Sequence, residues 1–115
     1  MATAAQIIET AAENLGIHGE GETLPSYETA DLTQAITEVY NELQKDNLTT
    51  WASTADIPDE YARSFAMLVA AARAVKYQIP DARFNRIKLG EMEAMHLFRR
   101  FQARSKLGQT AIENF

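Results

Sequence analysis

Cysteine is missing from this sequence of 115 residues. Its absence excludes disulfide bonds and zinc sites built on cysteine, and it suits a protein of a reducing compartment. Histidine is scarce, since His18 and His96 are the only two and lie far apart in the sequence, without the spacing of metal ligands. We therefore expect the protein to bind no metal and no cofactor.

Long apolar runs and leader-like segments are lacking as well. The longest apolar run, FAMLVAAARAV, is interrupted by Arg73 and is far shorter than the roughly 20 residues of a membrane-spanning helix. The opening residues, MATAAQIIETAAENLG, contain Glu9 and Glu13 and lack the basic start of a signal peptide. The sequence thus predicts no membrane partner.

Residue combinations typical of catalysis are not found. The sequence has no cysteine nucleophile, no serine elbow and no H-E-x-x-H motif. Glu9 and Glu13, and likewise Glu38 and Glu42, lie one helical turn apart, which superficially resembles a glycosidase pair. Exposed carboxylates outside an apolar pocket have no cause for the unequal pKa values that such catalysis needs. We expect a protein that is not an enzyme, with a hydrolase of cell-wall glycans as the weakest alternative.

Three glycines fall within the stretch LGIHGEGETLP, between Leu15 and Pro25. A phosphate-binding glycine loop normally follows a strand and has a lysine nearby. Here the preceding residues have a helical pattern, and Glu20 and Glu22 place negative charge where a phosphate would lie. We interpret the stretch as a connector between two helices, with Gly16 in the left-handed conformation that ends the first one.

Charge is distributed very unevenly along the chain. Residues 1–60 contain twelve acidic residues and one basic residue, a net charge of −11, whereas residues 61–115 contain ten basic and four acidic residues, a net charge of +6. The two halves attract each other. Opposite charges of this kind either close within one molecule or join neighbouring copies head to tail in a ring.

Four segments have the apolar spacing of amphipathic helices, and no segment alternates with the period of a strand. We expect helices over about 3–15, from Ser26 to about Asn47, from Pro58 to about Tyr77, and over about 81–104. The predicted fold is all-α, a four-helix bundle-like domain over residues 1–104. Residues 105–115, SKLGQTAIENF, form a C-terminal arm that either frays or orders its apolar residues against a partner.

The third segment is alanine-rich and apolar nearly all round, which predicts a central, buried helix. Arg73 within it either extends from the rim to solvent or requires an acidic partner. Glu91, inside the apolar arc of the fourth segment, pairs either with Arg73 or with an arginine of a neighbouring copy. Gly90 either allows a close helix crossing or breaks the fourth helix. Trp51, the only tryptophan, is expected to anchor its loop to the helices.

The order of these signals resembles the head-to-tail adaptor family of tailed bacteriophages. This family includes the tail accessory, or packaged-DNA stabilisation, factors of short-tailed phages and the head-completion connectors of long-tailed phages. The resemblance covers about residues 5–104 and rests on LPSYETADLTQAITEVYNELQKDNLTTW and IPDEYARSFAMLVAAARAV. The family's Leu-Gly turn after the first helix corresponds to Leu15 and Gly16. Its apolar stripe on the second helix, which ends at a tryptophan, corresponds to Leu43 and Trp51, and its IP-x-x-Y helix start corresponds to Ile57, Pro58 and Tyr61.

This resemblance implies a structural virion protein that assembles as a ring, typically of twelve copies, beneath the portal in the neck between head and tail. Such a ring seals the DNA exit and presents a surface to tail proteins. The implied partners are the portal protein, neighbouring adaptor copies and tail proteins, with DNA only as channel contents and with assembly in the host cytoplasm. The candidate partner-binding residues are Arg99, Arg100, Arg104, Lys106, Leu107, Ile112 and Phe115. The alternative is a small helical nucleic-acid-binding regulator that uses the basic fourth helix.

Overall fold

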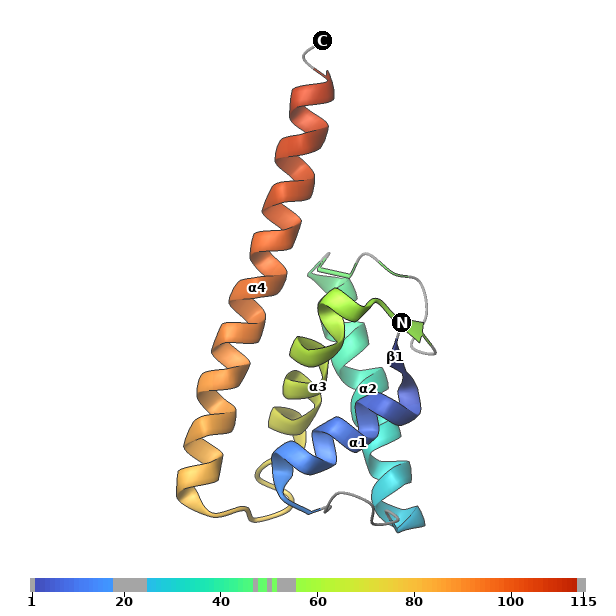
Figure 1. The fold of residues 1–115 in the computed structure, drawn as a ribbon, viewed down its shortest axis with the longest axis vertical. Helices are drawn as coiled ribbons and strands as arrows, with labels where there is room; N and C mark the ends of the chain where they lie inside the picture. Colours follow the sequence, from blue (N-terminus) through green and yellow to red (C-terminus); the bar gives the residue numbers. More distant parts are fainter. Residues whose placement is uncertain (1, 18–24, 47, 50, 52–55, 114–115) are drawn as a thin grey trace.

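The computed structural model describes residues 2–17, 25–46, 48–49, 51 and 56–113, with residues 102–113 described as helical backbone alone. Its elements are α1 (Ala4–Leu15), α2 (Ser26–Lys45), α3 (Asp59–Arg73) and α4 (Asp81–Glu113), with two short strands, β1 (Ala2–Thr3) and β2 (Asp56–Ile57) (Figure 1). The all-α prediction is confirmed. The strands form one antiparallel ladder, which the sequence prediction missed because two residues are too few to display an alternating pattern.

Helix α1 begins and ends as the sequence predicts. The Gln6 amide donates to the Thr3 hydroxyl at 3.3 Å, and the Thr3 amide donates to the Gln6 side chain at 2.9 Å, which together form a capping box. Gly16 ends the helix in the left-handed conformation, with φ of 76°. Arg83 of α4 donates to the carbonyl groups of two residues in the last turn, at 3.4 Å each, so α4 also stabilises this helix end.

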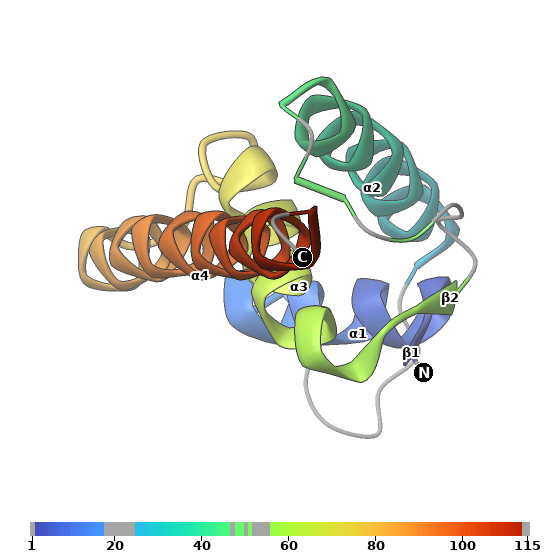
Figure 2. The ribbon, with the colours of Figure 1, turned by 90° about the horizontal axis from the view of Figure 1, so that it is seen from above.

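Helix α3 is the centre of the domain and contacts each of the other three helices (Figure 2). This confirms the prediction of a central, alanine-rich helix. The helix ends at Arg73, four residues before the predicted Tyr77, because the chain turns through residues 74–78 with Gln78 at φ of 49°. Its buried residues are Tyr61, Phe65, Ala66, Leu68, Val69, Ala70 and Ala71.

Trp51 joins the loop after α2 to three helices. Its ring centre lies 5.0 Å from that of Tyr61, 6.0 Å from that of Phe65, and 6.1 Å from those of Tyr40 and Phe98. The Tyr40 hydroxyl donates to the Trp51 carbonyl at 2.8 Å. These contacts confirm that the tryptophan is a packing anchor, and they connect α2, α3 and α4 at one end of the domain.

Helix α4 packs closely against α3 around Gly90. A Cβ atom at this glycine would lie 2.8 Å from the Met67 sulfur, so the two helices approach as closely as glycine permits. The helix continues unbroken through Gly90, so of the two predicted alternatives the close helix crossing is correct and the helix break is not. Among residues 81–101 of this helix, Ile87, Ala94 and Phe98 are buried.

The helix also continues well past its predicted end. We expected it to stop near Arg104, but its backbone remains helical to Glu113, so most of the predicted arm is a direct extension of α4. The physical reason is that this stretch contains no proline and that Gly108 weakens a helix by only about 1 kcal/mol. The molecule is 54 Å long, and the end of α4 projects beyond the other helices (Figure 1).

Candidate interaction surface

A nearly buried carboxylate, Asp31 of α2, connects this helix to the turn between α3 and α4. Asp31 is 9% exposed. Its Oδ1 accepts from Lys76 Nζ at 2.7 Å and lies 3.3 Å from Arg73 Nε, while its Oδ2 accepts from the Tyr77 hydroxyl at 2.8 Å. Arg73 also forms an ion pair with Glu38, whose Oε2 lies 3.0 Å from its Nη2. We call Asp31, Glu38, Arg73, Lys76 and Tyr77 the Asp31 cluster.

Mutual contacts shift the pKa values of three members of the cluster, Asp31, Lys76 and Tyr77. Burial alone would raise the pKa of Asp31, but the hydrogen bonds from Lys76 and Tyr77 and the charge of Arg73 outweigh it, so the pKa lies below its usual value. The hydrogen bond to Asp31 raises the pKa of Lys76. Burial, followed by the hydrogen bond to Asp31, raises the pKa of Tyr77. At neutral pH the cluster therefore holds an ionised carboxylate and a protonated tyrosine.

The partner of Arg73 differs from the one considered from sequence. Glu91 was one candidate, yet Arg73 pairs with Asp31 and Glu38, and the Glu91 carboxylate lies 3.7 Å from Lys88 one turn earlier in α4. The sequence reasoning failed here because local spacing does not show which of two helices, α2 or α4, brings its carboxylates to Arg73. Part of the attraction between the acidic and basic halves of the chain thus closes within one molecule.

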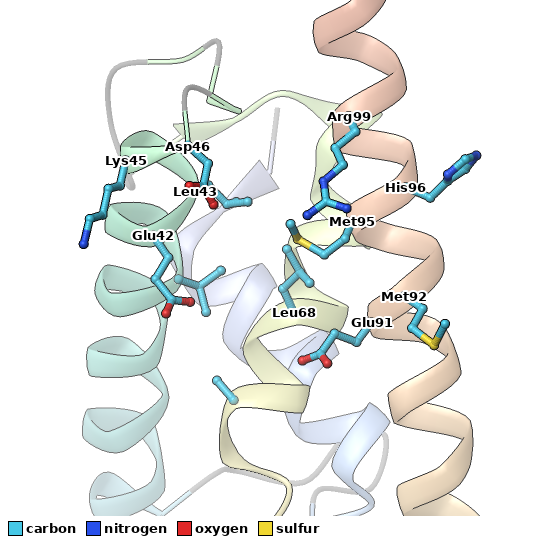
Figure 3. Close-up of a pocket in the computed structure, with 12 residues that line it drawn as sticks. Glu42, Leu43, Lys45, Asp46, Leu68, Glu91, Met92, Met95, His96 and Arg99 are labelled. Atoms are coloured by element: carbon cyan, nitrogen blue, oxygen red, sulfur yellow. The ribbon is translucent and has the colours of Figure 1, made fainter.

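A groove of about 760 Å³ separates α2 from α4, with α3 as its floor (Figure 3). Helix α2 contributes one wall through residues 39–46, and α4 contributes the other through residues 91–99. Glu91, Met95 and Arg99 point toward the groove, whereas Met92 and His96 turn to the outer side of α4. The residues of α4 that line the groove extend from Glu91 to Arg99, toward the half of the helix that projects from the domain.

The groove combines an apolar floor with charged walls. Leu43 and Leu68 lie at its base and are largely buried. Glu42 and Asp46 are exposed on the α2 wall, and Arg99 is exposed on the α4 wall. An open channel of this shape suits the side of a helix, which can place small or apolar residues on the floor and basic residues against the acidic wall.

No family model matches the chain, and neither a curated protein nor a solved structure matches it. The resemblance to phage adaptors therefore stays a prediction from the sequence. Within the part of the chain that the structure describes, no helix is long and apolar enough to span a bilayer, and no three acidic or histidine side chains gather as metal ligands would.

The residues predicted to bind partners lie along the second half of α4. Arg99 lines the groove, and Arg100 is exposed beside a second groove on the opposite face of this helix, of about 820 Å³. Arg104, Lys106, Leu107 and Ile112 are positions of the projecting helix, and Phe115 lies outside the described residues. The glycine loop, with Glu20 and Glu22, also lies outside them. The structure thus brings one predicted residue, Arg99, into the groove.

Sequence reasoning missed the Asp31 cluster. A signal was present, because Asp31 directly precedes Leu32 and lies one turn before Ala35, both of which are fully buried. A carboxylate at the edge of a buried stripe requires a cationic or hydroxyl partner. The pattern could have identified that requirement but not the residues that meet it.

Proposed function

We propose that this chain is a structural subunit of a tailed-phage virion, a head-to-tail adaptor that acts through its surfaces rather than by catalysis. In this proposal the copies assemble as a ring beneath the portal in the virion neck, seal the DNA exit and present the surface to which the tail attaches. The partners are the portal protein, neighbouring copies and tail proteins. DNA is present only as channel contents, and assembly takes place in the host cytoplasm.

The observation that carries this proposal is the length of α4 relative to the domain that supports it. A helix of 33 residues is about 50 Å long, close to the full 54 Å of the molecule. Its first part packs on α3, and its last turns continue beyond α1, α2 and α3 (Figure 1). A small domain that maintains a long projecting helix is suited to reach across to another protein.

Charge supports the same interpretation. The stretch from Arg99 to Lys106 contains Arg100 and Arg104 as well and no acidic residue. Arg99 and Arg100 are exposed at its start. A basic helical segment of this kind steers association with an acidic surface, and it fixes the orientation of the two partners.

The test uses the full chain and portal rings encoded by the same genome. Light scattering after size exclusion gives the mass of the chain alone, of the rings alone and of the mixture. We expect a stoichiometric complex that is weakened by the double substitution Arg99→Glu and Arg100→Glu. The matched control, Arg86→Glu, reverses an exposed charge earlier on the same helix and should leave the complex intact. Portal rings that elute without the chain would refute the adaptor proposal.

A second candidate, a nucleic-acid-binding regulator, is favoured by one observation. Arg86, Arg99 and Arg100 are all exposed on α4, where three phosphate contacts are conceivable. Three such contacts would give a slope of about −2.7 in a plot of log affinity against log salt concentration. Titration of labelled duplex DNA at several salt concentrations measures this slope, and undetectable binding at low salt removes the candidate.

A further inference from the structure

We infer that residues 102–113 of α4 dock into the groove between α2 and α4 of a second copy of this chain. The contact would join neighbouring copies in the proposed ring, so the inference rests on the proposed function. The projecting helix end would occupy the groove, and the groove would be the binding site of that helix end. Four features of the molecule support it: the direction of α4, the spacing of its residues, its charge and its length.

The direction of α4 excludes the groove of the same molecule. The helix is continuous from Asp81 to Glu113. Its last turns therefore extend away from the groove that its own residues 91–99 line (Figure 1). Only another copy can bring this segment into the groove. Because the donated segment and the accepting groove are different surfaces, the contact is head to tail and repeats from copy to copy, as it does in a ring.

The spacing of the buried residues of α4 continues along the part of this helix that extends beyond α3. The buried positions Ile87, Ala94 and Phe98 follow steps of seven and four residues. The same three-and-four spacing continues at residue 101 and then at Ser105, Gly108 and Ile112. By helical register, the face that α3 covers in the first half of α4 extends along the projecting half. Small residues at two of these positions permit a close approach of another helix.

The charges of segment and groove are complementary. Arg104 and Lys106 are basic, and Glu113 is the only acidic residue of the segment. The α2 side of the groove exposes Glu42, Lys45 and the C-cap residue Asp46, and the α4 side carries Glu91 and Arg99. With the 105–108–112 face over the apolar floor, helical register places Arg104 and Lys106 on opposite flanks of the segment, so Lys106 lies beside Glu42 on the α2 side and Arg104 beside Glu91 on the α4 side. Both the orientation of the segment and its partner surface follow from this match.

The length of the segment also fits the groove. Twelve helical residues span about 18 Å, whereas the α4 wall from Glu91 to Arg99 spans about 12 Å. The segment therefore covers the whole groove, with about one turn left to connect the two molecules. A shorter extension, ending near Arg104 as the sequence suggested, would reach only the groove entrance.

The absence of cysteine allows a direct test in the full chain. Two single-cysteine variants, Glu42→Cys in the groove wall and Lys106→Cys in the segment, are mixed and oxidised with oxidised glutathione. We expect the mixed disulfide to form at least about tenfold faster than with the control Glu9→Cys, an exposed position on α1. A rate equal to that of the control, or a chain that shows no association with itself, overturns the inference.

A charge exchange tests the same contact without a cross-link. Glu42→Lys should weaken self-association by about tenfold in sedimentation equilibrium, and the double variant Glu42→Lys with Lys106→Glu should restore it. Glu9→Lys is the control with the same change in net charge. Unchanged self-association of Glu42→Lys contradicts the contact. Portal binding without the 42–106 cross-link supports the adaptor proposal and refutes this contact. A 42–106 cross-link without portal binding supports this contact and refutes the adaptor proposal.

Discussion

Replacement of Asp31 by asparagine removes the charge at the centre of the Asp31 cluster while keeping the size of the side chain. In the native protein this carboxylate accepts hydrogen bonds from Lys76 and Tyr77 and faces Arg73. An asparagine retains one acceptor oxygen and presents an amide group, which cannot accept, to the remaining donors. Arg73 then loses a nearly buried counter-charge and retains only Glu38.

The expected loss of stability is about 2–3 kcal/mol. Removal of one member of a fully buried ion pair typically costs 3–5 kcal/mol, and a hydrogen bond to a charged group contributes about 1.5–3 kcal/mol. The lower range applies here because the Lys76 side chain is 47% exposed and can be solvated. Arg73 also keeps its ion pair with Glu38, whose own side chain is half exposed and contributes little.

The pH dependence provides a second, independent signature. Because the pKa of Asp31 is lower in the folded protein than in the unfolded chain, its ionised form stabilises the fold. This contribution is complete above the unfolded value of about 4 and is lost as the pH falls further, through the folded pKa. The difference in unfolding free energy between wild type and Asp31→Asn should therefore be constant near neutrality and shrink below about pH 4.

Urea denaturation provides the measurement. Helix content by circular dichroism and Trp51 fluorescence are followed together, and coincident curves support a two-state treatment. Asp56→Asn, at an exposed strand position, is the matched control and should remain within about 0.5 kcal/mol of wild type. An Asp31→Asn variant as stable as this control, or a difference that stays the same down to pH 3, would refute the account of the cluster.

Three further substitutions test other parts of the fold by the same denaturation assay. Gly16→Ala should cost about 1–2 kcal/mol, because φ is 76° and the new Cβ would lie 2.8 Å from the Arg83 guanidinium; no loss would contradict this. Trp51→Ala should cost about 3 kcal/mol through its lost ring contacts, and a loss below 1 kcal/mol would show that the ring is no anchor. Tyr77→Phe should cost about 1 kcal/mol at neutral pH. Because the pKa of Tyr77 is raised on folding, this difference should shrink above about pH 10, and one that grows there would be inconsistent.

The parts of the fold that sequence reasoning predicted are those governed by local rules. The left-handed Gly16 and the buried, alanine-rich α3 depend on neighbours within one or two turns. Trp51 was also placed correctly, because a large ring at the end of an apolar stripe has few ways to avoid the core. For Gly90 the sequence left two outcomes, a close helix crossing or a helix break, and the proximity of Met67 in the structure shows the close crossing.

The parts that it missed depend on contacts between distant segments. Nothing near Asp31 in the sequence indicates that Arg73, Lys76 and Tyr77 surround it. The groove is likewise created by how α2 and α4 diverge over α3, which no periodicity encodes. Among the predicted partner-binding residues whose side chains the structure describes, Arg99 alone lines the groove, and the acidic residues of its α2 side belong to the acidic half of the chain that the sequence analysis identified.

The position of the Asp31 cluster has a mechanical consequence. Arg73 is the last residue of α3, and Lys76 and Tyr77 belong to the turn that leads to α4, so the cluster lies close to the pivot of a lever about 50 Å long. A rotation of about 10° at that pivot would move the far tip by roughly 9 Å on a helix of this length. The hydrogen bonds on one carboxylate thus help to fix the direction in which α4 leaves this turn, and the burial of Ile87, Ala94 and Phe98 keeps that direction along the helix.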